Sequence, residues 1–362
     1  MKICIVSNFK PSGYGESTRP GQMAKYLHQM GHDILHICDT DETIDGIKHL
    51  YIARNTWQAG GLNKTVAFIK NYLTIALFNP DFIYVHQFNN AEWAVQTRLF
   101  KGRRIVFDAH TSSYLEHLHF KVDKSLLDEV IRREGTICRK ADFIIAASAE
   151  TKEVLQTQYN LEPNKLDVAG NATNIKPVET LAPLNTTEFT ILATLPQDGF
   201  ESNKMALDML LAIATKVYSI NSAVKFHVVG GGKMPPSPPP NVIYRGYVPD
   251  LREAILNATI CMMAFPEDAV CGGARNKFCD YIALAKTVVT TPEGLRGMEI
   301  LEHNKNCVVA NDVDGLVAVI TDLAHNPAKI EAIEREVFTI RHYFNWADRA
   351  KKVESIFKRL LN

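Results

Sequence analysis

The chain has 362 residues, which is more than one hydrophobic core usually serves, so we expect two domains. Hydrophobic residues make up 46% and charged residues 22%, a composition typical of globular proteins. The 40 lysines and arginines are balanced by 40 aspartates and glutamates. This balance argues against a nucleic-acid-binding protein, because such proteins usually carry a basic excess.

The seven cysteines argue against both a disulfide framework and a zinc site. Their number is odd, no C-x-x-C spacing occurs, and most lie in apolar runs, so we expect reduced, buried thiols. The sequence opens directly on a strand-like segment without a secretory signal, and no apolar stretch approaches the length of a membrane span. These features predict a cytoplasmic protein.

The first half of the chain alternates between strand and helix patterns. Residues 2–7 form an unbroken apolar run, typical of a buried strand. A glycine-containing loop, a helix at 22–30 and a strand at 33–38 follow, and this βαβ order indicates a parallel sheet. The alternation continues with strands at 48–53, 80–86, 104–108, 143–147 and 166–169, and helices at 62–77, 91–100, 126–139 and 152–159.

Residues 175–187 interrupt this alternation with two prolines and little periodicity, and we interpret them as an interdomain linker. A second alternating set follows the linker. It has strands at 189–193, 224–229, 242–244, 260–265, 287–290 and 306–310, and helices at 205–217, 251–256, 313–324, 328–338 and 346–361. Each half is therefore expected to be a doubly wound α/β domain.

The stretch 272–297 carries the clearest indication of chemistry. Its opening glycine pair lets the backbone approach a ligand, and a helical pattern begins directly after it. Arg275 and Lys277 flank this helix start, where free N–H groups and the helix dipole favour phosphate. Asp280, one turn later, suits the hydroxyl groups of a ribose. The pattern indicates a nucleoside diphosphate; the alternative is a glycine turn followed by a helix with a solvated Lys277–Asp280 pair.

Two doubly wound domains with such a motif late in the second describe a known architecture. The segment G-A-R-N-K-F-C-D-Y-I-A-L-A-K-T-V-V-T-T at 273–291 resembles the pattern G-x-R-x-K-x-x-E-A-M-A-x-G-x-P-V-V-x-T. That pattern is typical of the retaining glycosyltransferases of the GT-B fold, family 4 (glycosyl transferases group 1). Looser resemblances are P-S-G-Y-G at 11–15, A-D-F-I-I-A-A-S at 141–148, V-A-G-N-A-T-N at 168–174, and the final helix.

The resemblance implies an α/β protein with two Rossmann-like, parallel-sheet domains facing a cleft. Residues 1–175 would form the acceptor-side domain. Residues 176–344 would form the domain that binds the nucleotide-sugar donor. The last helix, within 345–362, would cross back to pack on the first domain.

The resemblance also assigns roles to individual residues, with His110, Arg275 and Lys277 expected to be catalytic. Arg275 and Lys277 would hold the donor pyrophosphate, and Asp280, which stands where the family has a glutamate, would bind ribose. His110 would contact the donor sugar; without the resemblance, a histidine at a strand end is more often a satisfied polar group. Lys204 would replace a phosphate-binding lysine. The loop residues of this set are Gly272, Gly273 and Ala274 on the donor side, and Gly13, Tyr14 and Gly15 on the acceptor side.

The chain departs from the family pattern in places. Many relatives have a Glu-x7-Glu pair, but Gly272 stands at the first of these positions, and Glu267 or Asp268 could supply a nearby carboxylate. Thr194 stands near the place of an arginine that is usual in the family. Ala172 replaces a glycine, which weakens any role of its loop.

The expected function is transfer of a hexosyl group from a nucleotide-diphosphate sugar to a glycan or lipid-linked acceptor, with retention of configuration. No cofactor or metal is expected, because Arg275 and Lys277 would stabilise the leaving phosphate, which could itself serve as base. Alternatives are a non-hydrolysing nucleotide-sugar epimerase and a catalytically silent, nucleotide-sugar-binding partner subunit. No nucleic-acid partner is expected. Residues 62–78 read mostly as a core helix, with peripheral contact to the inner face of a membrane as the alternative.

Overall fold

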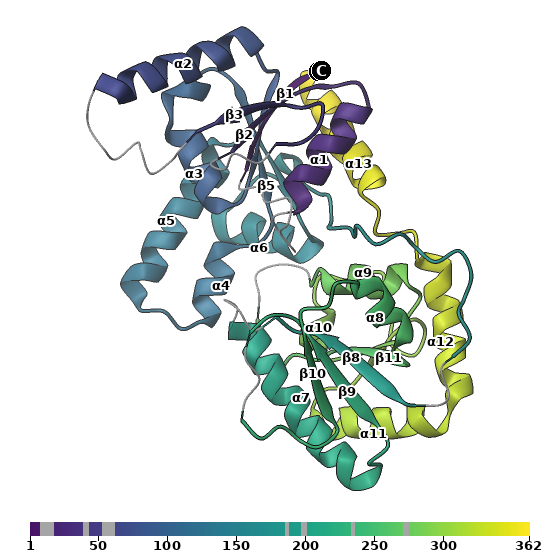
Figure 1. The fold of residues 1–362 in the computed structure, drawn as a ribbon. Coiled ribbons are helices and arrows are strands. Elements are labelled where there is room, and N and C mark those ends of the chain that lie inside the picture. Colours follow the sequence, from purple (N-terminus) through teal and green to yellow (C-terminus); the bar gives the residue numbers. More distant parts are fainter. Residues whose placement is uncertain are drawn as a thin grey trace. The chain divides into compact units, whose positions relative to one another are not determined.

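The computed structural model describes residues 1–7, 18–38, 43–52, 62–184, 188–196, 201–232, 236–270 and 275–362. The chain divides into two compact units, Met1–Ala172 with Trp346–Asn362, and Thr173–Asn345 (Figure 1). The first unit is thus built from two separate pieces of sequence, and the second unit is inserted between them. Within the described ranges, no helix has the length and apolar character needed to cross a membrane.

The first unit contains a seven-stranded parallel sheet in the order β3-β2-β1-β4-β5-β6-β7. Its central strands are short apolar runs buried on both faces, as expected of a parallel sheet with helices on each side, whereas the edge strand β3 is exposed or half-buried. They are β1 (Lys2–Ser7), β2 (Asp33–Cys38), β3 (Lys48–Tyr51), β4 (Phe82–His86), β5 (Arg104–Ala109), β6 (Phe143–Ala146) and β7 (Leu166–Val168).

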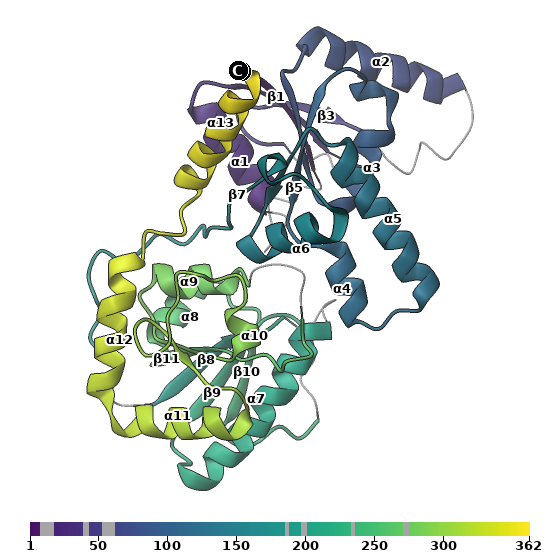
Figure 2. The same cartoon turned by 180° about the vertical axis from the view of Figure 1, so that it is seen from behind.

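Helices cover both faces of this sheet because successive side chains of each strand point to opposite sides. Helices α1 and α13 lie side by side (Figure 2) and share a core with Ile3 and Ile5. The ring of Phe357 on α13 stacks on Phe82 at 4.6 Å between centroids. The alternate residues of the strands pack against helices of the other face. The helices are α1 (Thr18–Gln29), α2 (Leu62–Phe78), α3 (Phe88–Gln96), α4 (Ser113–His119), α5 (Lys124–Lys140), α6 (Ala149–Tyr159) and α13 (Trp346–Leu361), with short 3-10 turns at Arg98–Phe100 and Pro163–Lys165.

The second unit contains a six-stranded parallel sheet in the order β10-β9-β8-β11-β12-β13. The chain builds outward from β8 to β10 and then returns to the other side of β8 with β11. Open α/β sheets bind ligands beyond the carboxyl ends of the strands at such a switch point. The strands are β8 (Thr190–Thr194), β9 (Lys225–Val229), β10 (Val242–Gly246), β11 (Ile260–Met263), β12 (Val288–Thr290) and β13 (Val308–Val309).

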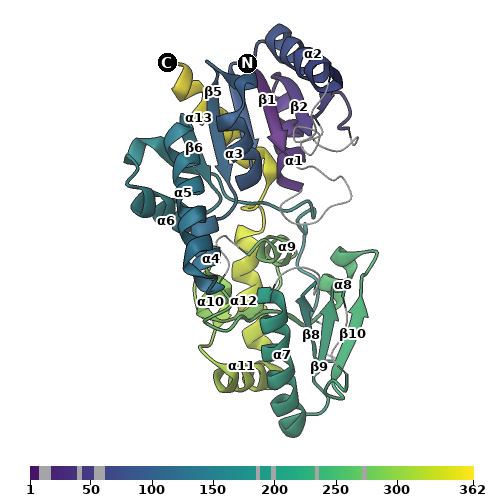
Figure 3. The ribbon, with the colours of Figure 1, turned by 90° about the vertical axis from the view of Figure 1, so that its left-hand side faces the viewer.

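In the described part of this unit, six helices flank the second sheet. The longest, α7, lies beside α11, and both can be followed in Figure 3. The apolar residues of the strands and helices form one continuous core. The helices are α7 (Glu201–Ile220), α8 (Leu251–Asn257), α9 (Lys277–Ala283), α10 (Pro292–Leu295), α11 (Val313–His325) and α12 (Pro327–Ile340). Both units confirm the predicted pair of doubly wound, Rossmann-like folds.

The segment predicted as a linker begins as part of the second unit. Val178 is buried in its core, and its N–H donates to the carbonyl of Ala283 at 3.0 Å. The carbonyl of Val178 accepts from Nε of Arg341 at 2.7 Å. Low periodicity correctly indicated irregular backbone, but an irregular segment can still be anchored by hydrogen bonds and one buried side chain.

Two short helices were not predicted from periodicity. At α4 the Ser112 hydroxyl accepts from the N–H of Leu115, and at α10 the Thr291 hydroxyl accepts from the N–H of Gly294. Pro292 takes the first position of α10, where its missing N–H costs nothing. Neither segment shows an apolar helical period, and their N-cap residues were the only sequence signal.

The six cysteines of the described ranges are buried free thiols, as the apolar runs around them predicted. Burial raises the pKa of the Cys4 and Cys261 thiols above the usual range of a cysteine. These thiols are therefore poor nucleophiles, because the thiolate is the reactive form. The expected reduced, structural role of these cysteines is consistent with this burial.

Candidate active site

Arg275 lies just before α9 and is fixed on three sides. Its Nη2 donates to the carbonyl of Ala269 at 2.6 Å and to Oε1 of Glu293 at 3.0 Å. The guanidinium carbon lies 3.7 Å from the ring centroid of Phe265. Phe265 and Ala269 follow β11, so Arg275 is held near the carboxyl end of a strand at the switch point. Its buried Nε has no hydrogen-bond acceptor among the described residues.

Glu293, in the first turn of α10, is the counter-ion of Arg275. Its second oxygen accepts from Nε of Arg296 at 2.7 Å. Burial raises the pKa of Glu293 and the two arginines lower it, leaving it above the ordinary value. Sequence reasoning missed Glu293. Its only signal was an acidic residue in the first turn of a short proline-initiated helix.

Gly294 lets α10 approach β11 closely enough for this ion pair. A Cβ at this position would lie 2.1 Å from the carbonyl oxygen of Met263 and 2.3 Å from the hydroxyl of Thr290. The Gly294→Ala variant is therefore expected to lose about 3 kcal/mol of unfolding free energy, measured by urea denaturation, because backbone must move.

The matched control is Gly170→Ala, where a Cβ would meet its nearest atom at an ordinary 3.6 Å. Equal stability of Gly294→Ala and wild type would contradict the close packing of α10. A loss in both variants would indicate a general effect of replacing glycine rather than this contact.

Lys277 is the first residue of α9, and its ammonium donates to Oδ1 of Asn203 at 3.1 Å. Asn203 is buried on α7, and its amide nitrogen is held by the carbonyl of Pro196 at 2.8 Å. Lys204, the residue predicted for the donor site, is exposed and pairs with Glu201 at 2.9 Å. The structure therefore brings Asn203, and not Lys204, to Lys277.

Asp280 lies one turn into α9 and is partly buried. The hydroxyl of Thr173 donates to its Oδ1. Burial raises the pKa of Asp280 to about 6, while the Thr173 hydrogen bond and the charge of Lys277 lower it. The Lys277–Asp280 pair is therefore not a solvated surface pair. Within the described ranges, the hydrogen bond from Thr173 uses one of the two Asp280 carboxylate oxygens and leaves the other to accept.

The raised pKa of Asp280 gives stability a specific pH dependence. The folded pKa of about 6 lies above the ordinary value of 3.8, so the folded state binds this proton more tightly than the unfolded state. Its contribution to stability is therefore full below about pH 4 and is lost as pH rises toward 6. The Asp280→Asn variant keeps an acceptor for Thr173. It should be more stable than wild type by about 2 kcal/mol at pH 7.5.

Urea denaturation of both proteins between pH 4 and pH 8 tests this, since the difference should shrink toward acid pH. A difference that is constant with pH would show that Asp280 does not titrate in this range. A Thr173→Val variant is the control for the hydrogen bond itself.

The remaining donor-side residues are placed as follows. Thr194 stands near the position where the family usually has an arginine. Its hydroxyl accepts a hydrogen bond from the hydroxyl of Tyr281 at 2.9 Å, so two neutral side chains occupy this position. Glu267 and Asp268 are exposed. The predicted loop residues lie outside the described part of the chain: Gly272, Gly273, Ala274, Gly13, Tyr14 and Gly15.

In the first unit, His110 belongs to a buried polar cluster around Asp108. Arg19, at the start of α1, donates from Nε to Oδ1 of Asp108 at 3.0 Å and from Nη2 to Oδ2 at 3.0 Å. The hydroxyl of Tyr84 also donates to Oδ2, and His86 Nδ1 lies 3.1 Å from His110 Nε2. Sequence reasoning found His110 but missed Arg19, whose partner Asp108 lies 89 positions away in the sequence.

The groups of His86, Asp108 and His110 lie within 4.8 Å of one another, as metal ligands would. The donor set does not fit a cation, however. Both oxygens of Asp108 already accept hydrogen bonds from the positively charged guanidinium of Arg19. A metal ion bound to Asp108 would lie next to this positive charge and be repelled by it. Burial would raise the pKa of Asp108, but Arg19 and the two histidines bring it below the ordinary value. The cluster is therefore an ion pair with two attached histidines.

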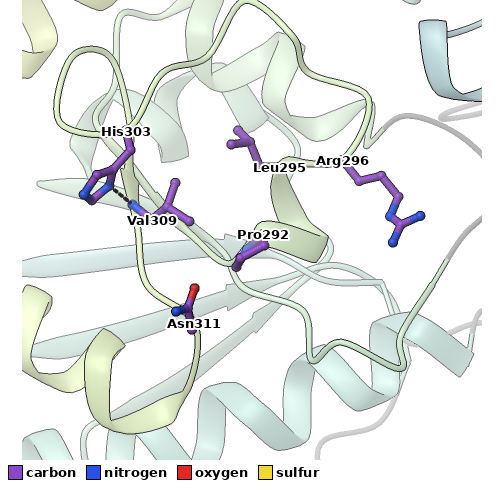
Figure 4. A pocket seen from close by; sticks show the side chains of 6 residues that line it. All are labelled: Pro292, Leu295, Arg296, His303, Val309 and Asn311. Atoms are coloured by element: carbon purple, nitrogen blue, oxygen red, sulfur yellow. Dashed lines mark hydrogen bonds between the residues drawn. The ribbon is translucent and has the colours of Figure 1, made fainter.

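A shallow hollow lies at the carboxyl ends of β12 and β13, and Figure 4 shows the side chains that line it. Its volume is about 560 Å³, and Arg296 connects it to the site through Glu293. The ring of His303 is fixed by the N–H of Val309 at 2.9 Å. The lining residues are Pro292, Leu295, Arg296, His303, Val309 and Asn311. The hollow lies over β12 and β13 rather than over the switch point, so we leave it outside the candidate site.

Comparison with known structures identifies the architecture. Sucrose-phosphate synthase from Thermosynechococcus elongatus is similar over 99% of both chains, with a TM-score of 0.76 and 14% identity. A glycosyltransferase from Rickettsia africae has a TM-score of 0.72 and 15% identity over 100% of this chain and 98% of its own. HepE from Anabaena, solved with UDP-glucose, has a TM-score of 0.73 and 15% identity over 99% of this chain and 100% of its own. At these identities the likeness shows the fold.

The sequence itself matches two family models. The model described as Glycosyltransferase Family 4 covers residues 17–176, and that described as Glycosyl transferases group 1 covers residues 198–326. No protein of curated function matches the chain in sequence. The two models follow each other along most of the chain, in the order of its two units. The chain belongs to the GT-B glycosyltransferases of family 4, glycosyl transferases group 1.

Proposed function

We propose that the protein transfers a hexosyl group from a nucleotide-diphosphate sugar to an acceptor hydroxyl with retention of configuration. The observation that carries this is the pair of cations at the switch point, Arg275 and Lys277. Their side chains are held by Glu293 and Asn203 in a family whose reaction releases a nucleoside diphosphate. HepE, which has the same fold, was solved with UDP-glucose, and this supports a nucleotide-sugar donor.

In the proposed reaction, the bond between the anomeric carbon and the diphosphate breaks, and negative charge grows on the leaving oxygen. Lys277 would meet this charge with its ammonium, which the amide oxygen of Asn203 positions at the start of α9. Arg275 adds a second, more rigid positive charge, since its guanidinium is stacked on Phe265 and paired with Glu293. Fixed charges cost no reorganisation in the transition state, and we propose that they suffice without a metal ion.

The other roles follow from hydrogen-bonding capacity. Asp280 would accept hydrogen bonds from the ribose hydroxyls through the carboxylate oxygen that does not bind Thr173. His110 would contact the donor sugar. The leaving phosphate would take the proton of the acceptor hydroxyl, which forms its new bond on the face that the phosphate left. This accounts for retention without a protein base. Lys204 is left out of the proposed site because its ammonium pairs with Glu201.

A thermal-shift screen of the full chain against UDP, GDP, ADP and their sugars, with and without magnesium, tests the donor class. A ligand that binds only the folded state raises the unfolding temperature by mass action. We expect selective stabilisation by one nucleoside diphosphate, equal with and without magnesium. Stabilisation that required magnesium would overturn metal independence, and no shift at millimolar ligand would favour the silent partner subunit.

Product analysis separates the remaining alternative. A transferase consumes the donor only with an acceptor or water, and the anomeric configuration of the product reports retention. A non-hydrolysing epimerase would instead convert the nucleotide sugar into its epimer with no acceptor present. Epimer formation in the absence of an acceptor would therefore replace the proposed function.

We also propose that the acceptor is lipid-linked and that α2 lies on an anionic membrane surface. Ile69, Tyr72, Leu73 and Leu77 occupy one helical face, and all are exposed, Leu77 by 82%. The 17 residues of α2 include two lysines and no acidic residue, which suits anionic lipid.

A Leu73→Glu/Leu77→Glu variant should lose co-sedimentation with vesicles containing phosphatidylglycerol, whereas Ile220→Glu on the second unit should retain it. Binding that is equal in all three proteins, or absent from wild type, would contradict this surface.

A further inference from the structure

The backbone at the start of the second unit runs along α9 and is fixed to it at two points. The hydroxyl of Thr173 donates to Oδ1 of Asp280. The N–H of Val178 donates to the carbonyl of Ala283 at 3.0 Å, about one turn further along the helix. The N–H of Thr173 also donates to the carbonyl of Phe344 at 3.1 Å. These bonds, all within the second unit, hold Thr173 in place beside Asp280.

The hydrogen bonds of the Thr173 hydroxyl determine the direction of its proton. The hydroxyl oxygen accepts from the N–H of Ile175 at 2.9 Å, a contact that threonine often makes with the residue two positions further on. Because an N–H can only donate, the hydroxyl proton is left for Oδ1 of Asp280. Oδ1 therefore accepts in both ionisation states of Asp280, and a proton taken up by this carboxyl resides on Oδ2.

The groups around Asp280 leave its carboxyl ionised at neutral pH. Burial raises the pKa of Asp280 to about 6, and its hydrogen bond from the threonine hydroxyl and the charge of Lys277 lower it. Tyr281, next in sequence, stays neutral because burial raises the pKa of its hydroxyl. On α12, which packs against α9, the buried Glu334 is paired with Lys286 at 3.2 Å. Above about pH 6, Oδ2 of the half-buried Asp280 therefore presents the lone pairs of a carboxylate.

We propose that Thr173 is a positioning residue that orients the carboxylate of Asp280 so that its second oxygen accepts from the hydroxyls of a ribose. This inference rests on the proposed function for the presence of a nucleoside diphosphate. It adds that ribose binding depends on two residues 107 positions apart in the sequence. A carboxylate that is already held in its binding orientation loses less conformational freedom when the ligand arrives.

The contact between Thr173 and Asp280 can be measured without any ligand. Carbon-13 spectra of the full chain, labelled at the aspartate carboxyls, follow the titration of Asp280, whose signal is the one missing from Asp280→Asn. Thr173→Val keeps the shape of the side chain but removes the hydroxyl that stabilises the ionised form. The midpoint should therefore rise by about one pH unit from the wild-type value of about 6. Thr173→Ser keeps the hydroxyl and should keep the midpoint.

Ribose binding is measured by comparing two ligands across pH. The probes are the ribonucleoside diphosphate among UDP, GDP and ADP that stabilises the chain, and its 2′,3′-dideoxy analogue. Titration calorimetry gives the ratio of their Kd values, and the titration of the phosphate cancels because both ligands share it. We expect wild type to prefer the ribose about 10- to 100-fold at pH 8, the value of hydrogen bonds to a charged group. This preference should fall below about pH 6, as Asp280 takes up a proton.

Thr173→Val should lower the preference for ribose about fivefold at pH 8, and its preference should begin to fall at a higher pH than that of wild type. Thr173→Ser should retain the wild-type preference. The matched control is Thr215→Val, because that exposed hydroxyl donates to the carbonyl of Leu211 within α7. This control should change neither the midpoint of Asp280 nor the preference.

The outcomes separate this inference from the proposed function. An equal midpoint in wild type and Thr173→Val would overturn the inference, and so would a raised midpoint with an unchanged preference. A wild-type chain that bound both ligands equally would also overturn it, while leaving a nucleotide site in place. A chain that bound no nucleoside diphosphate would overturn the proposed function together with the role in ribose binding, and the ligand-free titration would still decide whether Thr173 controls Asp280.

Discussion

The Lys277→Ala variant should bind the nucleoside diphosphate weakly and transfer sugar about 10²- to 10³-fold more slowly than wild type. That is the usual cost of removing one group that stabilises a developing oxyanion. The effect should appear mainly in kcat, because the charge on the leaving oxygen is larger in the transition state than in the bound donor. Steady-state kinetics with the donor identified by thermal shift measure both parameters.

Two lysines of α7 serve as comparisons. Lys216→Ala removes an exposed lysine that pairs with Asp314 on α11, away from Asn203, and should leave kcat unchanged. Lys204→Ala tests the assignment made from sequence. If Lys204→Ala lowered kcat as much as Lys277→Ala, the phosphate site would extend to Lys204, against the ion pair with Glu201. Full activity of Lys277→Ala would remove Lys277 from the proposed site.

The Arg19→Met variant should lose about 3–5 kcal/mol of unfolding free energy. Arg19 and Asp108 are both almost fully buried, and removing one member of a buried ion pair leaves the other charge uncompensated. Arg19 also donates to the carbonyls of Ala169 at 2.7 Å and Gly170 at 2.8 Å, which would lose their partner. Urea denaturation measures the loss.

The double variant Arg19→Met/Asp108→Asn separates charge from packing. A buried amide costs less than a buried carboxylate without a counter-ion, so the double variant should recover part of the lost stability. If it were as unstable as Arg19→Met alone, the loss would come from the carbonyl contacts and packing of Arg19 rather than from the charge of Asp108.

The fold was predictable because its determinants are local in sequence. Strands buried on both faces appear as unbroken apolar runs such as residues 2–7, and the helices between them are long enough to show a period. The cations at 275 and 277 and the carboxylate at 280 were found for the same reason, since all three lie within two turns of chain. Short elements such as α4 and α10 carried only cap residues, and these do not predict a helix alone.

The contacts that organise the site were not predictable, because they join residues distant in sequence. Glu293 lies 18 positions from Arg275, and Asn203 lies 74 positions from Lys277. Nothing in the spacing of the chain pairs these residues, and only the order of the strands in the sheet brings them together. The neighbouring Lys204 matched the expected residue type, but the turn of α7 directs Asn203 inward.

The two-piece construction of the first unit has a consequence for synthesis on the ribosome. Chains fold domain by domain as they emerge, and α13 is the last described helix to leave the ribosome. Until α13 emerges, the sheet face that carries Phe82 and Tyr84 is not covered by Phe357. By that time the whole second unit has already been synthesised. The inserted unit can therefore finish folding before the unit that began first, and the nascent chain must shield an apolar sheet face for the length of 173 residues.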